Sequence, residues 1–162
     1  MLTAVIRADG SPNALAATFA VLISAVADGF LGHAVVVDVA SDSETERLAD
    51  ATGASYLRSN GAEGWHLGAA EARGDWLLLL DAGDAPQHHW TQAVERHLLL
   101  SPDQPALIPL RGVAGSLRER AAISFGPCRL RAGLVASKSA VLAGHLGRTP
   151  RRLPVMRERA LG

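Results

Sequence analysis

Short apolar runs alternate with helix-like segments four times in the first hundred residues, and no other feature of the sequence restricts the fold as much. Apolar runs that end in polar turns are typical of buried strands. The predicted strands cover residues 2–6, 34–37, 55–58 and 76–80. Strands that follow one another through a crossover helix run parallel. The sequence therefore predicts an α/β fold, with a mainly parallel open sheet and helices on both faces.

Local signals place the helices between these strands. Ser11 followed by Pro12 predicts the start of a first helix with apolar residues at helical spacing. The segment Ser43-Glu44-Thr45-Glu46 has the spacing of a capping box, with Ser43 as the cap. Gly53 is placed to end that second helix.

The later part of the chain has weaker patterns. Asp84 and Pro86 predict the start of a helix that carries Trp90 on its apolar side. Beyond that helix the expected elements are strands at 106–110 and 134–136 and helices at 116–122 and 137–143.

The length of 162 residues predicts one domain, residues 1–162. The longest nearly apolar run covers residues 14–27, which is shorter than the about 20 residues that a membrane-spanning helix needs. The single cysteine, Cys128, rules out an internal disulfide, and no Cys/His spacing is that of a zinc finger. We therefore expect a cytoplasmic protein, and the Ala- and Arg-rich composition indicates a bacterial one.

The formal net charge of zero is a cancellation between two parts of the chain. Residues 1–103 hold 14 acidic and 5 basic side chains, a net charge of −9, and residues 104–162 hold 2 acidic and 11 basic ones, a net charge of +9. The balance predicts no nucleic-acid partner. The arginine-rich part could bind a diphosphate, an acidic partner or an anionic membrane surface, or the two parts could attract each other within the fold or between subunits of a homo-oligomer.

Polar residues follow the predicted strands at the positions where α/β proteins bind ligands, outside the carboxyl ends of the strands. These candidates are Arg7, Asp9, Asp38, Ser41, Asp81 and Asp84. Common phosphate and hydrolase signatures are missing: no Gly-x-Gly-x-x-Gly follows the first strand, and neither a Walker-type loop nor Gly-x-Ser-x-Gly occurs. Dinucleotide-binding, P-loop and α/β-hydrolase functions are therefore disfavoured.

The stretch from Ala72 to Asp84 carries the most specific motif, Ala-Arg-Gly-Asp-Trp-Leu-Leu-Leu-Leu-Asp-Ala-Gly-Asp. It resembles the Arg-Gly-Asp-x-(apolar)4-Asp-Ala-Asp-Asp segment of family 2 glycosyltransferases, which have the GT-A fold. Leu134-Val135-Ala136-Ser137-Lys138 is similar to a late strand of that family. The resemblance covers about residues 2 to 100 well and the rest weakly.

The resemblance implies transfer of a sugar from a nucleoside diphosphate sugar to an acceptor that the sequence does not identify. Asp81, with Asp84, would hold a divalent metal, Mn²⁺ or Mg²⁺, at the diphosphate, since carboxylates are hard oxygen ligands. Asp38 would contact the nucleoside, and we expect Ser41 and Asp9 to bind the nucleotide beside it. Glu158 stands at the second position of the family's Glu-Asp pair, which provides the base that deprotonates the acceptor hydroxyl, so the resemblance makes Glu158 the candidate catalytic base.

The sequence also departs from the family pattern. Gly83 stands where the second carboxylate of Asp-x-Asp is expected, Val39 replaces a second acid near the nucleoside, and Arg157 replaces the first residue of the Glu-Asp pair. These departures favour an alternative, a catalytically impaired GT-A-like domain that binds a nucleotide, a protein or a membrane surface.

Each candidate also has a purely structural explanation. Asp38 and Asp81 could simply end strands and cap turns, and Asp84 before Pro86 could cap a helix. His88 and His89 could complete a metal site with Asp81 or lie in solvent. A third possibility is a general α/β scaffold in a homo-oligomer, whose arginine-rich tail docks on an acidic partner or membrane.

Overall fold

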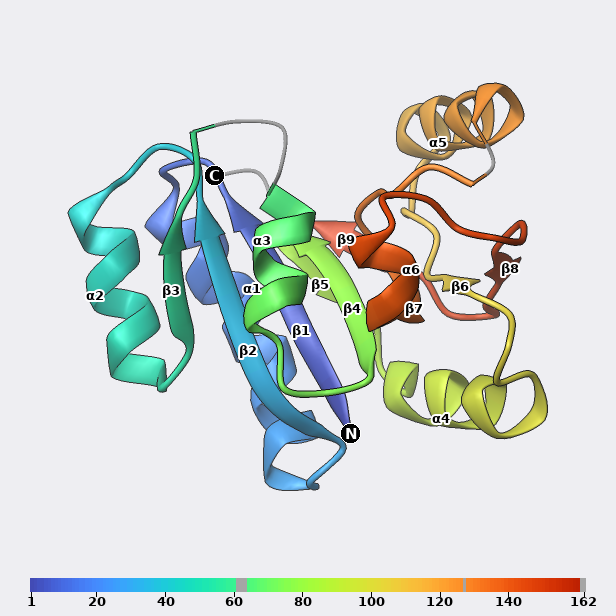
Figure 1. Ribbon diagram of the computed structural model, residues 1–162. Coiled ribbons are helices and arrows are strands. Elements are labelled where there is room, and N and C mark those ends of the chain that lie inside the picture. The colour runs from blue at the N-terminus through green and yellow to red at the C-terminus, as the bar shows by residue number, and fades with distance from the viewer. Residues whose placement is uncertain (61–63, 127, 161–162) are drawn as a thin grey trace.

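The computed structural model describes residues 1–60, 64–126 and 128–160, which form a seven-stranded sheet, a separate two-stranded sheet and six helices (Figure 1). The strands are β1 Leu2–Ala8, β2 Leu31–Asp38, β3 Ser55–Arg58, β4 Trp76–Asp81, β5 Asp84–Pro86, β6 Ala106–Leu107, β7 Leu134–Ser137, β8 Arg151–Arg152 and β9 Arg157–Arg159. The helices are α1 Pro12–Ala27, α2 Ser43–Thr52, α3 Gly64–Glu71, α4 Trp90–Leu100, α5 Val113–Phe125 and α6 Lys138–Leu142.

The large sheet has the order β3-β2-β1-β4-β7-β6-β8. β3, β2, β1 and β4 are parallel, and β7 is antiparallel to both of its neighbours. This confirms the predicted mainly parallel α/β sheet. In its register, Arg7 of β1 is opposite Asp81 of β4, and Ala8 is opposite Asp38 of β2, so the carboxyl ends of three strands meet at one edge.

Apolar side chains alternate between the two faces of the sheet because successive strand residues point to opposite sides. Ile6 and Leu80 pack into a core with Leu15 and Leu22 of α1, whereas Val5 and Leu79 pack into a second core with Trp65 of α3. Figure 1 shows α3 in front of the sheet and α1 behind it. Helices therefore cover both faces, as predicted. Among the described residues, no helix is long and apolar enough to span a membrane.

The N-terminal cap of α2 differs from the prediction by one residue. Asp42, not Ser43, is the N-cap, and its Oδ2 accepts a hydrogen bond of 2.9 Å from the backbone N–H of Thr45. Gly53 ends the helix in the left-handed conformation, as predicted. A carboxylate one position earlier therefore caps the helix in place of the hydroxyl of Ser43.

The predicted helix start at Asp84 and Pro86 is wrong. Asp84–Pro86 is strand β5, which pairs antiparallel with β9 near the C-terminus, and α4 begins only at Trp90. Local sequence favoured a cap at Asp84, but pairing with a strand more than 70 residues later decides the conformation. The strand predicted at 106–110 is also shorter, since β6 contains only Ala106–Leu107.

Candidate functional site

A cleft of about 560 Å³ opens at the edge where β1, β2 and β4 end. It is lined by side chains from these strand ends, the first turn of α1 and the segment at β9: Arg7, Asp9, Ser11, Ala14, Val39, Asp81, Ala82, Arg159 and Ala160. The register of the parallel strands makes this cleft, because it brings three strand ends to one level. The cleft is therefore where the strand-end rule expects a ligand.

Asp81 is held between two arginines in this cleft. Its Oδ1 accepts from Nε and Nη2 of Arg7 at 3.0 and 2.8 Å, and its Oδ2 accepts from Nη2 of Arg159 at 3.0 Å. Arg7 comes from β1 and Arg159 from β9, so the carboxylate bridges the start and the end of the fold. Both arginine side chains remain partly exposed, at 42% for Arg7 and 40% for Arg159.

Asp84 is fully buried and is also paired with two arginines. Its Oδ1 accepts from Nε and Nη2 of Arg159 at 2.9 and 2.8 Å, and its Oδ2 accepts from Nε of Arg157 at 3.2 Å and from the backbone N–H of Asp81 at 3.1 Å. A buried carboxylate needs such partners, since an unpaired charge in the interior is strongly destabilising.

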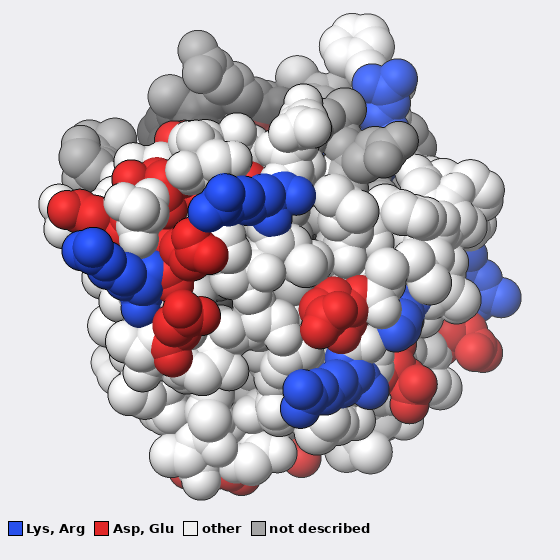
Figure 2. All heavy atoms as spheres, turned by 60° about the vertical axis from the view of Figure 1, so that its left-hand side comes forward, with Lys and Arg blue, Asp and Glu red and all other residues white. Residues whose placement is uncertain are grey.

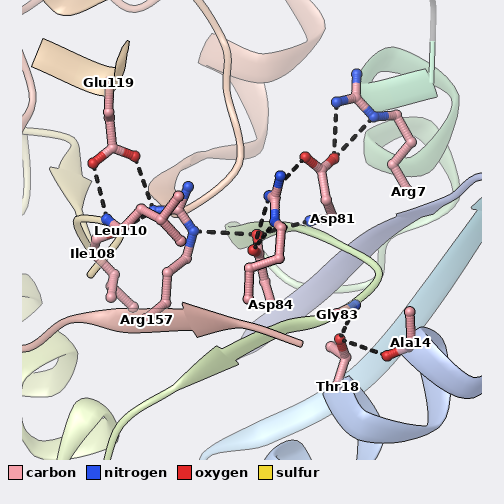
Figure 3. Close-up of polar contacts among 11 residues, drawn as sticks. Arg7, Ala14, Thr18, Asp81, Gly83, Asp84, Ile108, Leu110, Glu119 and Arg157 are labelled. Atoms are coloured by element: carbon pink, nitrogen blue, oxygen red, sulfur yellow. Dashed lines mark hydrogen bonds and ion pairs between the residues drawn. The ribbon is translucent and has the colours of Figure 1, made fainter. Parts of the chain in front are cut away.

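Arg157 links this pair to a third carboxylate. Figure 3 shows its guanidinium between Asp84 and Glu119, and Nη1 donates to Glu119 at 2.9 Å and to the carbonyl of Ile108 at 2.6 Å. A Cβ on Gly133 would lie 2.6 Å from Nη1 of Arg157, so glycine at that position leaves room for the guanidinium. The buried cluster fixes β9 and thereby the position of Arg159.

Gly83, where the family motif has a second carboxylate, lies in a turn that a side chain does not fit. Its φ is +93°, and a Cβ there would lie 2.9 Å from the carbonyl oxygen of Ala160. Its N–H donates to Thr18 Oγ1 at 2.9 Å, and its carbonyl accepts from the N–H of Ala160 at 2.9 Å. The missing carboxylate is thus explained by the close packing of the C-terminal segment on this turn.

The predicted nucleotide-binding residues lie at or next to the cleft, in different environments. Asp9 lines it, whereas Asp38 is fully buried beside it. The carboxylate of Asp38 accepts from the backbone N–H of Ala40 and Asp42 at 2.9 and 2.7 Å and from the Tyr56 hydroxyl at 2.9 Å. Asp38 therefore shapes the loop after β2.

Ser41, the third predicted nucleotide-binding residue, is exposed in that loop and has a positive φ of 58°. Val39, two residues earlier in the same loop, lines the cleft. The loop after β2, which the hydrogen bonds of Asp38 hold in place, therefore forms one side of the cleft.

Glu158, the predicted base, lies apart from this cleft. Neighbouring residues of a strand point to opposite sides, so Glu158 faces away from Arg157 and Arg159. It lines a separate hollow of about 740 Å³ that also contains His88 and His89. Hydrogen bonds from Arg111 at 2.5 Å and Gln87 at 3.1 Å hold the pKa of Glu158 below its usual value. The structure does not bring Glu158 together with Asp81.

The divalent metal predicted at Asp81 and Asp84 does not fit this arrangement. Mg²⁺ requires oxygen ligands at about 2.0–2.1 Å in octahedral geometry. Every carboxylate oxygen of the two aspartates already accepts an N–H from a guanidinium or the backbone. Within the described part of the chain, no group of three or more His, Cys, Asp or Glu side chains is placed to hold a metal ion. Ion pairs with arginines take the place of the expected metal site.

The sequence pattern does not indicate that Arg159, Arg157 and Glu119 belong to this cluster, and it marks Arg7 only as a strand-end residue. The division of charge was the available signal, because Arg157 and Arg159 belong to the basic part and Asp81 and Asp84 to the acidic part. On the face drawn in Figure 2, basic and acidic side chains also lie side by side. The two parts attract each other within the fold, one of the alternatives that the sequence left open.

No protein-family model and no curated protein sequence matches the chain. Solved structures of glycosyltransferases do. Glucosyl-3-phosphoglycerate synthase from Mycobacterium tuberculosis, in complex with Mn²⁺, UDP-glucose and phosphoglyceric acid, has a TM-score of 0.67 at 19% identity, over 86% of this chain and 57% of that chain.

The S. aureus protein TarS, residues 1–349, has a TM-score of 0.62 at 13% identity, over 87% of this chain and 48% of that chain. A complex of TarS with UDP has a TM-score of 0.54 at 15% identity, over 70% of this chain and 36% of that chain. The chain spans about half the length of the first two structures. At these identities the likeness shows the fold alone, and the chain has the GT-A fold.

Proposed function

We propose that the cleft at the ends of β1, β2 and β4 is the donor site of a glycosyltransferase-like protein and binds a nucleoside diphosphate sugar. The observation that carries this proposal is the place of the cleft: it lies at the carboxyl ends of parallel strands in a GT-A fold. The M. tuberculosis synthase was crystallised with UDP-glucose, and TarS with UDP. Both ligands contain the diphosphate and nucleoside that we assign to this cleft.

Different side chains of the cleft would bind the nucleoside and the diphosphate of the ligand. The loop after β2, organised by Asp38 and contributing Val39 to the wall, would receive the nucleoside together with Asp9. Arg7 and Arg159 are the cationic side chains of the cleft, and the diphosphate is the anionic part of the ligand. The sugar would extend from the diphosphate toward the open side.

Transfer requires an acceptor hydroxyl whose oxygen attacks the anomeric carbon while the bond from that carbon to the diphosphate breaks. The hydroxyl proton passes to a base, and the nucleoside diphosphate leaves with the negative charge. Glu158 stays our predicted base, but its lowered pKa makes it a weak one.

Binding without transfer is a second candidate function. The observation that favours it is the separation of Glu158, which lines another hollow, from the cleft that holds Asp81. In this case the domain would recognise a nucleotide sugar and leave chemistry to another protein or domain.

Calorimetric titration with UDP, GDP, UDP-glucose and GDP-mannose tests the shared part of both candidates. We expect saturable binding of at least one diphosphate nucleotide and a rise in melting temperature, because a ligand that binds only the native state stabilises it. Failure of all four to bind, with and without Mn²⁺, would contradict the proposal. If one binds, release of free sugar from it by the wild-type chain but not by Asp81→Ala would favour the transferase over the binding module.

A further inference from the structure

We infer that Arg7 and Arg159 bind the diphosphate directly and replace the divalent cation at this site, so that recognition of the anionic ligand is independent of metal. This inference rests on the proposed function and names how the same cleft recognises its ligand. The carboxylates expected to hold a metal are instead paired with guanidinium groups through every one of their oxygens.

The guanidinium groups of Arg7 and Arg159 meet at one carboxylate. One carboxylate, Asp81, holds Arg7 by Oδ1 and Arg159 by Oδ2, so both guanidinium groups are fixed on a single small group at the end of β4. Both line the cleft and are partly exposed there. Two positive charges therefore stand where the fold would otherwise place one divalent ion.

Arg7 and Arg159 both keep N–H donors for a ligand. A guanidinium has five N–H donors in one plane. Arg7 uses only Nε and Nη2 for Asp81, and Arg159 uses Nε and Nη2 for Asp81 and Asp84. Nη1 of each thus keeps two N–H groups that no other described residue engages. Such paired N–H groups match the oxygens of a phosphate.

The side chains of Arg7 and Arg159 are held in place by their neighbours. Arg7 lies over the ring of the buried Trp65, with its guanidinium carbon 4.7 Å from the ring centroid. Arg159 is fixed by the fully buried Asp84, which Arg157 also holds. A ligand therefore does not have to order these long side chains, and the entropic cost of binding is reduced.

The positive and negative charges of the cluster are equal in number. The cluster contains three arginines and three carboxylates, Asp81, Asp84 and Glu119, so its formal charges cancel. A divalent ion entering the cluster would add two positive charges, and no carboxylate of the cluster is left unpaired to balance them. A diphosphate would meet carboxylates that are already neutralised, beside the first turn of α1, whose N-terminal end carries partial positive charge.

The test is titration of UDP and of inorganic pyrophosphate into the protein in EDTA and again in Mn²⁺. We expect UDP to bind in EDTA with an affinity within about threefold of that in Mn²⁺, and Arg7→Gln and Arg159→Gln each to weaken it at least about tenfold, as loss of a charge-assisted contact does. Arg96→Gln, an exposed arginine of α4 outside the cleft, is the matched control and should leave the affinity unchanged. Should Arg159→Gln fail to fold, Arg7→Gln and Arg159→Lys carry the test.

Asp81→Asn distinguishes a metal held by Asp81 from direct binding of the diphosphate by the two arginines. If Asp81 were a metal ligand, this variant would lose UDP binding in Mn²⁺, whereas our inference predicts that it still binds UDP in EDTA, because Asp84 still holds Arg159 and Arg7 still lies over Trp65. Binding that appears only with Mn²⁺ overturns the inference and leaves the proposed function standing. Pyrophosphate binding in EDTA without any nucleotide binding would contradict the proposed function and leave metal-independent recognition of a diphosphate standing.

Discussion

Gly83 shows at the level of one residue why the family motif cannot simply be restored. A side chain there meets both a left-handed backbone and the carbonyl of Ala160. We expect Gly83→Ala to reduce the free energy of unfolding by about 2–4 kcal/mol, from backbone strain of about 1–2 kcal/mol together with the displaced contact. Gly144→Ala is the control: its φ of +77° is similar, but nothing lies within 4 Å.

Urea denaturation of both variants measures the difference between strain alone and strain with a clash. We expect Gly144→Ala to lose only about 1–2 kcal/mol. Equal losses in the two variants would show that Ala160 does not press on the turn at Gly83.

Arg157 is the residue on which the buried cluster depends. Arg157→Gln leaves Asp84 and Glu119 with fewer partners in the interior, and we expect a loss of about 3–5 kcal/mol in the free energy of unfolding. Arg111→Gln is the matched control, because its pair with Glu158 is more than half exposed on both sides. Exposed pairs contribute only about 0–1 kcal/mol. Similar denaturation midpoints for the two variants would contradict the structural role of Arg157.

Among the elements, β2 contains a pH-sensitive residue. His33 is buried, its Nε2 lies 3.0 Å from the Ser55 hydroxyl, and its Nδ1 has no partner among the described residues. Burial, followed by the nearby positive charge of Arg73, lowers the pKa of His33. Protonation is therefore easier in the unfolded chain, so the stabilisation is present above an ordinary histidine pKa of about 6.5 and is lost as the pH falls toward the folded value.

We expect the free energy of unfolding to fall between pH 7.5 and pH 5 in the wild type, and to fall less in His33→Asn. The exposed His145, replaced by Asn, is the control and should keep the wild-type slope. Denaturation curves at several pH values give these slopes. The same slope in His33→Asn and the wild type would assign the pH dependence to other groups.

Elements defined by local patterns were predictable from the sequence, and those defined by distant partners were not. β4 follows directly from the apolar run Trp76 to Leu80, and the end of α2 follows from Gly53. β5 was mistaken for a helix start because its conformation depends on pairing with β9. The same limit applies to the site: Asp81 was placed at a strand end by its own sequence context, but its partner Arg159 comes from 78 residues away.

For the whole molecule, the division of charge between the two parts of the chain now has a structural meaning. Arg157 and Arg159 of the basic part neutralise Asp81 and Asp84 of the acidic part. These two arginines are therefore used inside the fold. Contact with an anionic membrane would have to rely on other basic residues, such as the exposed Arg151 and Arg152 of β8. The fold itself was predictable because four strand-helix repeats leave few topologies open.

The pairing of β9 with β5 also affects the order in which parts of the protein fold during synthesis. Asp81 and Asp84 leave the ribosome more than 70 residues before Arg157 and Arg159, so the nascent chain holds both carboxylates without these partners. Contacts between such distant segments form late, because a long loop must first close. The early strands can bring Arg7 to Asp81 during synthesis, but Arg159 joins the cleft only after β9 has been made and has paired with β5.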